Sequence, residues 1–508
     1  MTGTPQGLGR RSFLGACVAA GAGLAGAHTL AGAGSPAERD RPGDPGWRIT
    51  DTGAEDAIEG YADRVSVASG ETFGLYVSTP APAYRVTAYR IGWYGGDQAR
   101  RVWHSGPHRG TVQPAPRFYP LTHTVRADWE RGLTVPTTGW PDGAYLLRLD
   151  ADGGAGGQRY VPLVVRSRAA AGRTVLLHAP ATWQAYNRWG GYSLYEGKDG
   201  DYRTRALVVS FDRPYDKDGA EKFLAYERAA VVLAERLGLP LAYTTGPDLD
   251  RDPGVLRGAA QVVILGHDEY MTPAQRAHLT RARDAGTNLA ILGANTCFRR
   301  IRLDPAPLEP PHPGDRRIVA CYKSAYPEDP HHGHQDALVT TDFRAAPAPD
   351  PESSLTGVLY EGYPVDAPYV VHRPDHWTHA GTGVRTGDSF PHLVGAEYDR
   401  VTPGAPTPEG IEIVAHSPVV CQGRHSHHDA AYYTAPSGAG VFATGTMRWV
   451  EALMAGTEEN GANHGMDART GRFVTRVTEN ILRTFATGPA APTHPAHGNL
   501  TEIYGEQP

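Results

Sequence analysis

The segment 261-QVVILGHDEYMTPAQ-275 places four consecutive polar side chains, His-Asp-Glu-Tyr, directly after an apolar run that is typical of a buried strand. If the chain stays extended through Gly266, the side chains of His267 and Glu269 point to one side and that of Asp268 points to the other. Histidine transfers protons near neutral pH, and carboxylate oxygen is a ligand that hard cations prefer. The segment therefore predicts acid–base or metal chemistry at the end of a strand.

Asn295 ends the next strand along the sequence, which is predicted over 287-TNLAILGAN-295. In an open parallel sheet, ligands bind beyond the carboxyl ends of the strands, and strands that follow one another in sequence are often neighbours in space. We therefore expect His267, Glu269 and Asn295 to face one crevice. The alternative interpretation is that these side chains only close strand–helix turns, for which Asp and Asn are common residues.

An aromatic segment, 181-ATWQAYNRWGGYSLYEG-197, is a second source of candidate residues. It follows the apolar strand 173–179 and contains Tyr186, Tyr192 and Tyr195. Its polar residues and its Gly pair predict a loop and not a helix. Because the segment leaves the carboxyl end of a strand, we expect it on the same edge of the sheet as the His-Asp-Glu-Tyr segment. The alternative is that its rings pack against a neighbouring β-domain.

Several common catalytic arrangements are absent from the sequence. No G-x-S-x-G or H-E-x-x-H motif occurs, which argues against a serine nucleophile elbow and against a zincin-type zinc site. Cys297 lies outside any G-x-C-x-G elbow, where a glutamine-amidotransferase-like sheet would carry its nucleophile. The remaining groups are tyrosines, a carboxylate and one histidine. Such oxygen donors suit a hard cation such as ferric iron better than zinc.

The elements that position these residues are predicted to form two regions of an α+β multidomain fold. Residues 47–167 show period-two alternation of apolar residues, as in 72-TFGLYVS-78, with turn signals between short strands. This pattern predicts an N-terminal β-sandwich domain. From 172 to 486, continuous apolar strands alternate with helices such as 219–238, and Thr272 begins a capping box before a further helix. That alternation predicts an α/β parallel sheet that is covered on both faces.

Four further segments are predicted from composition and pattern. Residues 206–211 are predicted to be a strand of the α/β region, and residues 300–440 a loop-rich or β-rich insertion within it. Residues 487–508 are predicted to be a tail. Proline, glycine and charged residues over 34–46 predict a linker ahead of the sandwich.

The first 33 residues are predicted to be a twin-arginine signal peptide. Arg10 and Arg11 precede a weakly apolar run that ends in small residues, with an A-x-A cleavage pattern at 31-AGA-33. Lipidation at Cys17 is the alternative. The protein is therefore expected to be secreted or held in the cell envelope. No other apolar run reaches the ~18 residues of a membrane-spanning helix, so no transmembrane anchor is expected.

Six motifs carry a family resemblance: 89-YRIGWYGG-96, 181-ATWQAYNRWGGYSLY-195, 210-SFDRPY-215, 262-VVILGHDEYMT-272, 291-ILGANTCFRR-300 and 439-AGVFATGTMRWV-450. In this order they resemble the N,N-dimethylformamidase large (beta) subunit family, over about residues 60–508. The resemblance implies a β-sandwich followed by an amidotransferase-like, Rossmann-like α/β domain.

The resemblance also implies a mononuclear ferric iron that is held by two tyrosines and one glutamate, with a histidine and an asparagine beside it. Glu269 matches the glutamate, and Tyr186 matches one tyrosine. His267 and Asn295 match the two neighbouring catalytic residues. Tyr145, which lies in a Gly-x-Tyr segment like one in the family, is our first candidate for the second tyrosine.

Tyr145 has an alternative interpretation. It shares one strand face with Leu147 and Leu149, so its ring could belong to the sandwich core. In that case Tyr192 and Tyr195 are the substitute candidates for the second tyrosine ligand.

The function that we predict is metal-assisted hydrolysis of the carbon–nitrogen bond of a small amide by an exported protein. Iron would polarise the carbonyl, His267 would act as base or proton relay, and Asn295 would donate a hydrogen bond to the oxyanion. Lys323 is expected to line the pocket. A small partner subunit or a homo-oligomer is in keeping with the family, whereas the net charge of −6 argues against nucleic acid. The alternative function is an exported cell-envelope binding protein with a carbohydrate-recognising sandwich and an inactive α/β site.

Overall fold

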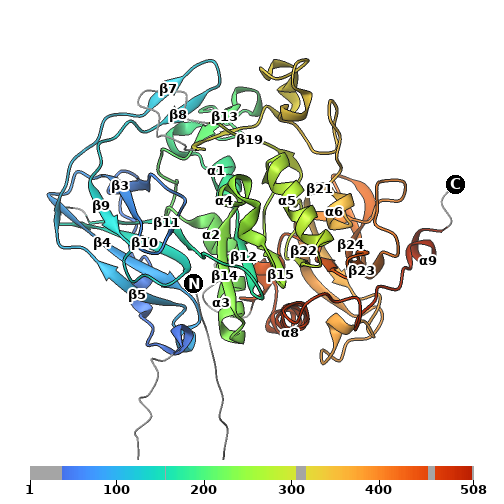
Figure 1. The fold of residues 1–508 in the computed structure, drawn as a ribbon. Coiled ribbons are helices and arrows are strands. Elements are labelled where there is room, and N and C mark those ends of the chain that lie inside the picture. The colour runs from blue at the N-terminus through green and yellow to red at the C-terminus, as the bar shows by residue number, and fades with distance from the viewer. Residues whose placement is uncertain (1–36, 155, 305–315, 456–463, 506–508) are drawn as a thin grey trace, which may run out of the picture. The chain divides into compact units, whose positions relative to one another are not determined.

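The computed structural model describes residues 37–154, 156–304, 316–455 and 464–505 (Figure 1). The predicted signal peptide and the first residues of the predicted linker lie outside the described residues. From Glu38 onward the chain forms one compact unit of mixed α+β structure. No helix in the described part of the chain is long and apolar enough to cross a membrane.

Two β-sheets pack face to face in the N-terminal region. Its strands are β1 (Glu59–Ala62), β2 (Ser66–Ala68), β3 (Thr72–Ser78), β4 (Ala83–Ile91), β5 (Ala99–His104), β6 (His108–Arg109), β7 (Arg117–Tyr119), β8 (Thr124–Arg126), β9 (Leu133–Pro136), β10 (Gly143–Asp152) and β11 (Gln158–Arg166). One sheet has the order β1-β3-β9 and the other β2-β11-β10-β4-β5, with β6 paired to β4, whereas β7 and β8 form a separate two-stranded sheet. Alternate side chains such as Leu75, Val86 and Leu147 are buried between them. The period-two pattern predicted this arrangement because only one face of each strand meets the opposite sheet.

The segment predicted as a linker is folded against the sandwich wherever it is described. It contains two short 3-10 turns, η1 (Glu38–Asp40) and η2 (Pro45–Trp47). The Glu38 carboxylate accepts a hydrogen bond from Nε of Arg100 at 2.8 Å, and Trp47, the residue directly after the predicted linker, is buried in the apolar core. These contacts hold the segment in place, so it is not a free spacer from Glu38 onward.

A mixed sheet forms the centre of the second region. In the described residues it has seven strands, in the order β14 (Leu241–Thr245), β12 (Thr174–His178), β15 (Gln261–Ile264), β17 (Asn288–Ile291), β25 (Gly440–Ala443), β24 (Arg424–Thr434) and β23 (Glu412–Cys421). The first five pair in parallel, and β24 and β23 extend the sheet in the antiparallel sense. The parallel sheet that the continuous apolar runs predict is therefore present.

Both faces of this sheet are covered, which explains why its central strands are apolar throughout. The helices that cover it are α3 (Arg228–Leu237), α4 (Gly246–Arg251), α5 (Pro273–Asp284) and α8 (Ala468–Phe485) (Figure 1). Val263 packs in one core with residues of α3 and α8, whereas Val262 and Ile264 pack in a second core with residues of α4 and α5. The predicted capping box of Thr272 and Gln275 begins α5.

The single helix predicted over 219–238 is two helices, α2 (Glu221–Tyr226) and α3. The backbone of Glu227 leaves helical geometry between them, with φ −129° and ψ −40°. Its buried carboxylate accepts hydrogen bonds from the backbone nitrogen of Ala179 at 3.1 Å and from the indole nitrogen of Trp183 at 2.8 Å. These contacts, which lie more than forty residues away in sequence, favour the break over a continuous helix.

Two predictions about the second region need correction. The strand predicted over 206–211 is β13 (Val208–Ser210), and it joins β20 (Ile318–Ala320) and β19 (Arg302–Asp304) in a small antiparallel sheet, not the main sheet. Within residues 300–440, β21 (Leu359–Val370) and β22 (Ser389–Arg400) form a long hairpin, but β23 and β24 are strands of the main sheet. The predicted insertion is therefore β-rich, but two of its strands belong to the main sheet.

The predicted tail is also folded as far as it is described. Asn499 donates from Nδ2 to the carbonyl oxygen of Ile413 at 3.0 Å, and its Oδ1 accepts from the Ile413 nitrogen at 2.8 Å. The remaining elements are β16 (Tyr270–Met271), β18 (Arg299–Arg300), α1 (Pro180–Tyr186), α6 (Ser353–Thr356), α7 (Trp449–Ala452), α9 (Leu500–Tyr504), η3 (Tyr94–Gly96), η4 (Trp189–Gly191), η5 (Tyr202–Thr204), η6 (Pro253–Leu256), η7 (Lys323–Glu328), η8 (Asp336–Leu338) and η9 (Trp377–His379).

Candidate active site

The His-Asp-Glu-Tyr segment follows β15 after a sharp turn at Gly266. Gly266 has a φ of +33°, so the chain is not extended there as the sequence analysis assumed. A Cβ on Gly266 would lie 2.1 Å from the carbonyl oxygen of Tyr226, and a Cβ on Gly293 would lie 1.4 Å from the carbonyl oxygen of Gly266. Only glycine allows such an approach. The end of β15 therefore lies directly against the loop that follows β17.

The predicted alternation of side chains holds from His267 to Glu269. Nε2 of His267 lies 3.5 Å from Oε2 of Glu269, so these two side chains face the same way. Asp268 lies instead beside Thr182 and Glu227, where burial and the Glu227 charge raise the pKa of Asp268 to about 8. Asp268 thus lies outside the hydrogen-bonded cluster around Glu269, although the charge of His267 opposes the rise in its pKa.

Two tyrosines share the carboxylate of Glu269. The hydroxyl of Tyr186, at the end of α1, donates to Oε2 of Glu269 at 2.6 Å. The hydroxyl of Tyr195 lies 2.8 Å from each oxygen of Glu269 and 2.9 Å from the hydroxyl of Tyr186. The two rings stack with their centroids 4.5 Å apart. The side-chain oxygen atoms of Tyr186, Tyr195 and Glu269 thus converge on one point.

The loop prediction for residues 181–197 is wrong for its first part, which is helix α1. The carboxylate of Glu227 fixes the start of this helix through Ala179 and Trp183, as described above, so its polar composition does not prevent it from forming. The turn at Gly190, with φ +75°, then brings the chain back so that Tyr195 stacks on Tyr186. Both expectations for this segment are met: Tyr186 and Tyr195 reach Glu269, and the ring of Trp189 packs against that of Trp129 in the sandwich region, with centroids 5.8 Å apart.

The surroundings favour a charged glutamate and neutral tyrosines in this cluster. Burial raises the pKa of the Tyr186 and Tyr195 phenols well above its usual value, and the charge of Glu269 raises it further. Burial alone would also raise the pKa of Glu269, but the adjacent His267 and the positive charge of Arg299 outweigh burial and lower that pKa to about 2. Nε of Arg299 donates to Oε1 of Glu269 at 3.2 Å. Both phenols therefore act as hydrogen-bond donors to an ionised carboxylate.

Tyr145, our first candidate for the second tyrosine, lies in the core of the sandwich. Its hydroxyl donates to the carbonyl oxygen of Pro141 at 2.7 Å, and its described contacts do not include Glu269. Tyr192 stacks against β7. Tyr145 does not reach the site because β10 directs its side chain between the two sheets. Of the two substitutes, Tyr195 is the one that the structure brings to Glu269.

A second carboxylate, Glu397 on β22, completes the site and was not predicted. Its Oε2 accepts a hydrogen bond from Nδ2 of Asn295 at 2.8 Å and lies 3.6 Å from Nε2 of His267. Asp399, two residues further along the same strand, accepts from the backbone nitrogen of Asn295 at 2.8 Å. These two acids fix Asn295 beside the end of β17. The available sequence signal was the pair of acids in the otherwise apolar stretch 393-LVGAEYD-399.

Glu397 and His267 form a pair that is suited to proton transfer. Burial raises the pKa of Glu397 to about 7, with a further contribution from the charge of Glu269 against the opposing charge of His267. Burial by itself would lower the pKa of His267, but the two carboxylates beside its Nε2 outweigh burial and raise that pKa above its usual value. A glutamate with a pKa of about 7 next to a histidine whose pKa is raised forms an acid–base pair that can exchange a proton.

Lys323, which was expected to line the pocket, lies beneath Tyr195. Its Nζ is 3.3 Å from the centroid of the Tyr195 ring and donates to the carbonyl oxygen of Leu194 at 2.8 Å. The side chain is fully buried, and burial lowers the pKa of Lys323 to about 7. Lys323 thus supports the face of the Tyr195 ring and holds its hydroxyl toward Glu269.

The cluster of Tyr186, Tyr195 and Glu269 fits a hard cation. Among the described residues, no group of three or more His, Cys, Asp or Glu side chains could hold a metal ion. This cluster is of a different kind, because two of its donors are phenols. Nε2 of His267 and Oδ1 of Asn295 are buried beside it, and neither has a hydrogen-bond partner in the described part of the protein. Buried polar atoms without partners point to a bound group at this place.

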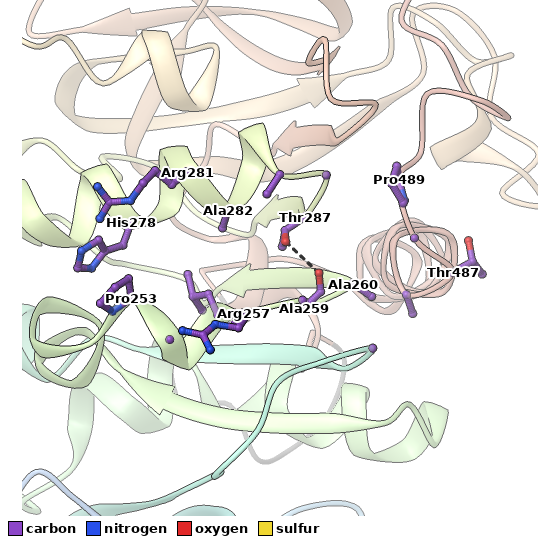
Figure 2. A pocket seen from close by; sticks show the side chains of 18 residues that line it. Pro253, Arg257, Ala259, Ala260, His278, Arg281, Ala282, Thr287, Thr487 and Pro489 are labelled. Carbon is purple, nitrogen blue, oxygen red and sulfur yellow. Dashed lines mark hydrogen bonds between the residues drawn. The ribbon is translucent and has the colours of Figure 1, made fainter.

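A cavity of about 570 Å³ lies elsewhere, at the amino ends of the strands of the main sheet (Figure 2). His278 and Arg281 lie at one end of it, and Thr487 and Pro489 at the other (Figure 2). Nδ1 of His278 is already bonded to the carbonyl oxygen of Leu249 at 2.6 Å. None of the side chains that line it carries a buried polar atom without a partner. Its chemistry therefore does not indicate a reaction.

The fold and the site define a class of protein with mixed α+β structure and a tyrosine–glutamate cluster at the carboxyl edge of a parallel sheet. The chain belongs to the N,N-dimethylformamidase beta subunit-like family: the family model described as "N,N-dimethylformamidase beta subunit-like, C-terminal" matches residues 85–464. The family inferred from the sequence motifs is thereby confirmed. The matched residues include Tyr186, Tyr195, Glu269 and Glu397.

The other comparisons add no information about function. No curated protein matches the sequence. Among solved structures, a cycloisomaltooligosaccharide glucanotransferase from Paenibacillus sp., complexed with cycloisomaltoheptaose, matches with a TM-score of 0.14 and 13% identity. That match covers 25% of this chain and 16% of the other, so a likeness this partial carries no conclusion.

Proposed function

We propose that this protein hydrolyses the carbon–nitrogen bond of a linear amide, with a metal ion held by Tyr186, Tyr195 and Glu269. The observation that carries the proposal is the convergence of these oxygen donors, at 2.6 to 2.9 Å from one another, next to His267 and Glu397. Membership of a family named for N,N-dimethylformamidase supports an amide as the substrate. The position of the site at the carboxyl edge of a parallel sheet supports an amidotransferase-like, Rossmann-like classification of this region.

The cofactor that we propose is mononuclear ferric iron. Two ionised phenols and one carboxylate carry three negative charges, which equal the positive charge of a ferric ion. Hard anionic oxygen donors also prefer such a cation to zinc. When bound, the ion supplies a Lewis acid that polarises an amide carbonyl.

The chain's own residues would then move the protons. Glu397, 3.6 Å from Nε2 of His267, takes a proton from the attacking water as the water oxygen bonds to the carbonyl carbon. His267 donates a proton to the amide nitrogen as the carbon–nitrogen bond breaks, which releases a carboxylic acid and an amine. Asn295 already donates to Glu397 at 2.8 Å, so we assign it the role of orienting this carboxylate. This role is in addition to the hydrogen bond to the oxyanion that the sequence predicts.

Glu397→Gln is expected to lower kcat/KM for amide hydrolysis by roughly 10²–10⁴-fold, the usual contribution of a general acid or base. Glutamine keeps an oxygen that accepts from Asn295, but it cannot carry the proton. Because Glu397 is not one of the three proposed metal donors, the iron content should stay the same. Amine release and metal analysis on the same preparation measure the two effects.

Glu412→Gln is the matched control for this experiment. Glu412 is a buried glutamate on β23, the outermost strand of the main sheet, and its carboxylate accepts from the backbone nitrogen of His497 at 2.9 Å. Its replacement should leave kcat/KM unchanged. If the unmodified protein releases no amine from small linear amides, the proposed function is wrong. If Glu397→Gln keeps full activity, only the proton-transfer role of Glu397 is wrong.

We propose export through the twin-arginine pathway, on the sequence of residues 1–33. Replacing Arg10 and Arg11 together by lysine is expected to leave the precursor in the cytoplasm, because the export machinery recognises the arginine pair. Immunoblots of cytoplasmic and exported fractions measure the distribution. Normal export of the double variant contradicts the assignment.

The family name also suggests that the protein forms a complex with other subunits. The family is named for a beta subunit, so we propose that the protein works with a small partner subunit or as a homo-oligomer. The net charge of −6 offers no reason to include nucleic acid among its partners.

A further inference from the structure

Lysine is rare in this chain, and half of the lysines lie at the candidate active site. The 49 basic residues include four lysines, at positions 198, 217, 222 and 323, and the other 45 are arginines. Lys323 supports the ring of Tyr195, as described above. Lys222, on α2, is half-buried and has no part in the mechanism so far.

The ammonium group of Lys222 borders the rings that surround His267. Its Nζ lies 5.0 Å from the ring centroid of Tyr186 and 5.7 Å from that of Tyr226. The same two rings pack against the imidazole of His267, with centroid distances of 5.4 and 5.6 Å. A substrate group held by Lys222 would therefore lie close to the residues that transfer protons.

In the described part of the chain, Lys222 has aromatic neighbours and no carboxylate within ion-pair distance. Among the described residues, its Nζ makes no hydrogen bond or ion pair, and its contacts are the two ring faces. Lys217, five residues earlier, is paired with Glu221 at 2.6 Å. A partly buried ammonium against aromatic rings still gains free energy from an anion, because charge-assisted hydrogen bonds are about twice as strong as neutral ones.

The other charged groups around the site do not take that place. Arg299 is itself shared between Glu269 and Asp342. Glu451 on α7 is near enough for its charge state to depend on Lys222: burial raises the pKa of Glu451 to about 7, and positive neighbours that include Lys222 oppose the shift. Within the described ranges the contacts of the Lys222 ammonium are the two ring faces, and Glu451 acts on it through charge and not through a direct ion pair.

We propose that Lys222 binds a carboxylate of the substrate, and that this site takes anionic linear amides of the N-acyl amino acid class in preference to neutral ones. The proposal rests on the amide hydrolysis proposed above and specifies its substrate. Carboxylate oxygens accept charge-assisted hydrogen bonds from Nζ, whereas a small neutral amide leaves the ammonium unpaired. The rings of Tyr186 and Tyr226 then border the part of the substrate between its carboxylate and its amide.

The test compares N-formylglycine with N-propylformamide, which share the formamide group and differ in carrying a carboxylate or an ethyl group. Formate release gives kcat/KM for each compound. The unmodified protein should favour N-formylglycine, and Lys222→Gln should lower the ratio of the two kcat/KM values by roughly 10- to 100-fold, as expected for a hydrogen bond to a charged group. Lys217→Gln, the matched control, should leave the ratio unchanged. Lys222→Arg keeps the charge and should recover part of the preference.

The possible outcomes separate the substrate proposal from the proposed function. Equal turnover of both compounds by the unmodified protein, or a ratio that Lys222→Gln does not change, overturns the carboxylate proposal and leaves amide hydrolysis standing. In the opposite case, the protein binds N-formylglycine but releases formate from neither compound. Calorimetry measures this binding. If Lys222→Gln abolishes it, the carboxylate site is supported and amide hydrolysis is refuted. A far-UV spectrum checks that Lys222→Gln folds. If it does not, the ratio in the unmodified protein and in Lys222→Arg decides.

Discussion

Replacing Glu269 by glutamine is expected to strip the proposed iron from the protein and to reduce the proposed amide hydrolysis to background. Glu269 is the one carboxylate in the proposed ligand set, and the hydroxyls of Tyr186 and Tyr195 both lie within 2.8 Å of it. Loss of its charge also leaves Arg299 paired with Asp342 but no longer with residue 269, so one negative charge beside the proposed metal is missing. Outer groups of metal sites alone change the affinity by about 10–100-fold, so removal of this charged donor should cost more than ~100-fold in iron affinity.

Iron content, visible absorbance and amine release measure this prediction side by side. The unmodified protein should contain about one iron per chain and be coloured, because phenolate bound to ferric iron absorbs visible light. Asp268→Asn is the matched control and should keep the iron, since Asp268 lies beside Thr182 and Glu227 and not in the cluster. Loss of iron in Asp268→Asn with retention in Glu269→Gln would refute the ligand assignment. Colourless protein with stoichiometric zinc would refute ferric iron.

Tyr195→Phe should also lose the iron and the colour, whereas Tyr145→Phe should keep both. The hydroxyl of Tyr195 is within 2.9 Å of Tyr186 and Glu269, so its removal deletes one of three proposed donors. Among the residues that the structure describes, the hydroxyl of Tyr145 donates to the carbonyl oxygen of Pro141, so its removal should lower the free energy of unfolding by about 1 kcal/mol, the net value of one hydrogen bond. Visible absorbance, metal analysis and urea denaturation of the two variants measure these effects.

This pair of variants separates two interpretations of the same sequence. Each variant replaces a buried phenol by a phenyl ring of the same shape, so packing changes little in either. If Tyr145→Phe removes the colour and Tyr195→Phe does not, the second tyrosine is the one first predicted from the sequence, and the cluster around Glu269 has another role.

Much of the fold could be predicted because the relevant signals are local. The period-two pattern over β3 and the continuous apolar run of β15 report which faces of a strand are covered, and this depends on a few neighbouring residues. The capping box at Thr272 is likewise complete within four residues, and α5 begins where that motif predicts.

The elements that were assigned wrongly depend on contacts that are distant in sequence. Glu227 interrupts the predicted helix because its carboxylate bonds to Ala179 and Trp183. β13 is not a strand of the main sheet because it pairs with β20, which lies more than a hundred residues later in the sequence. Neither partner can be recognised from the residues next to the element, so a pattern in one segment cannot predict the outcome.

For the site, the sequence by itself determined that His267 and Glu269 lie on one side of the chain with Asp268 on the other, and the motifs determined the family. Only the tertiary structure decided that Tyr195, and not Tyr145, reaches Glu269, and that Glu397 joins the site. In sequence, a buried phenol that donates to a backbone carbonyl looks the same as one that donates to a carboxylate. Glu397 is 102 residues from Asn295, and the two meet only when β22 packs beside the loop after β17, so their contact is a property of the folded chain.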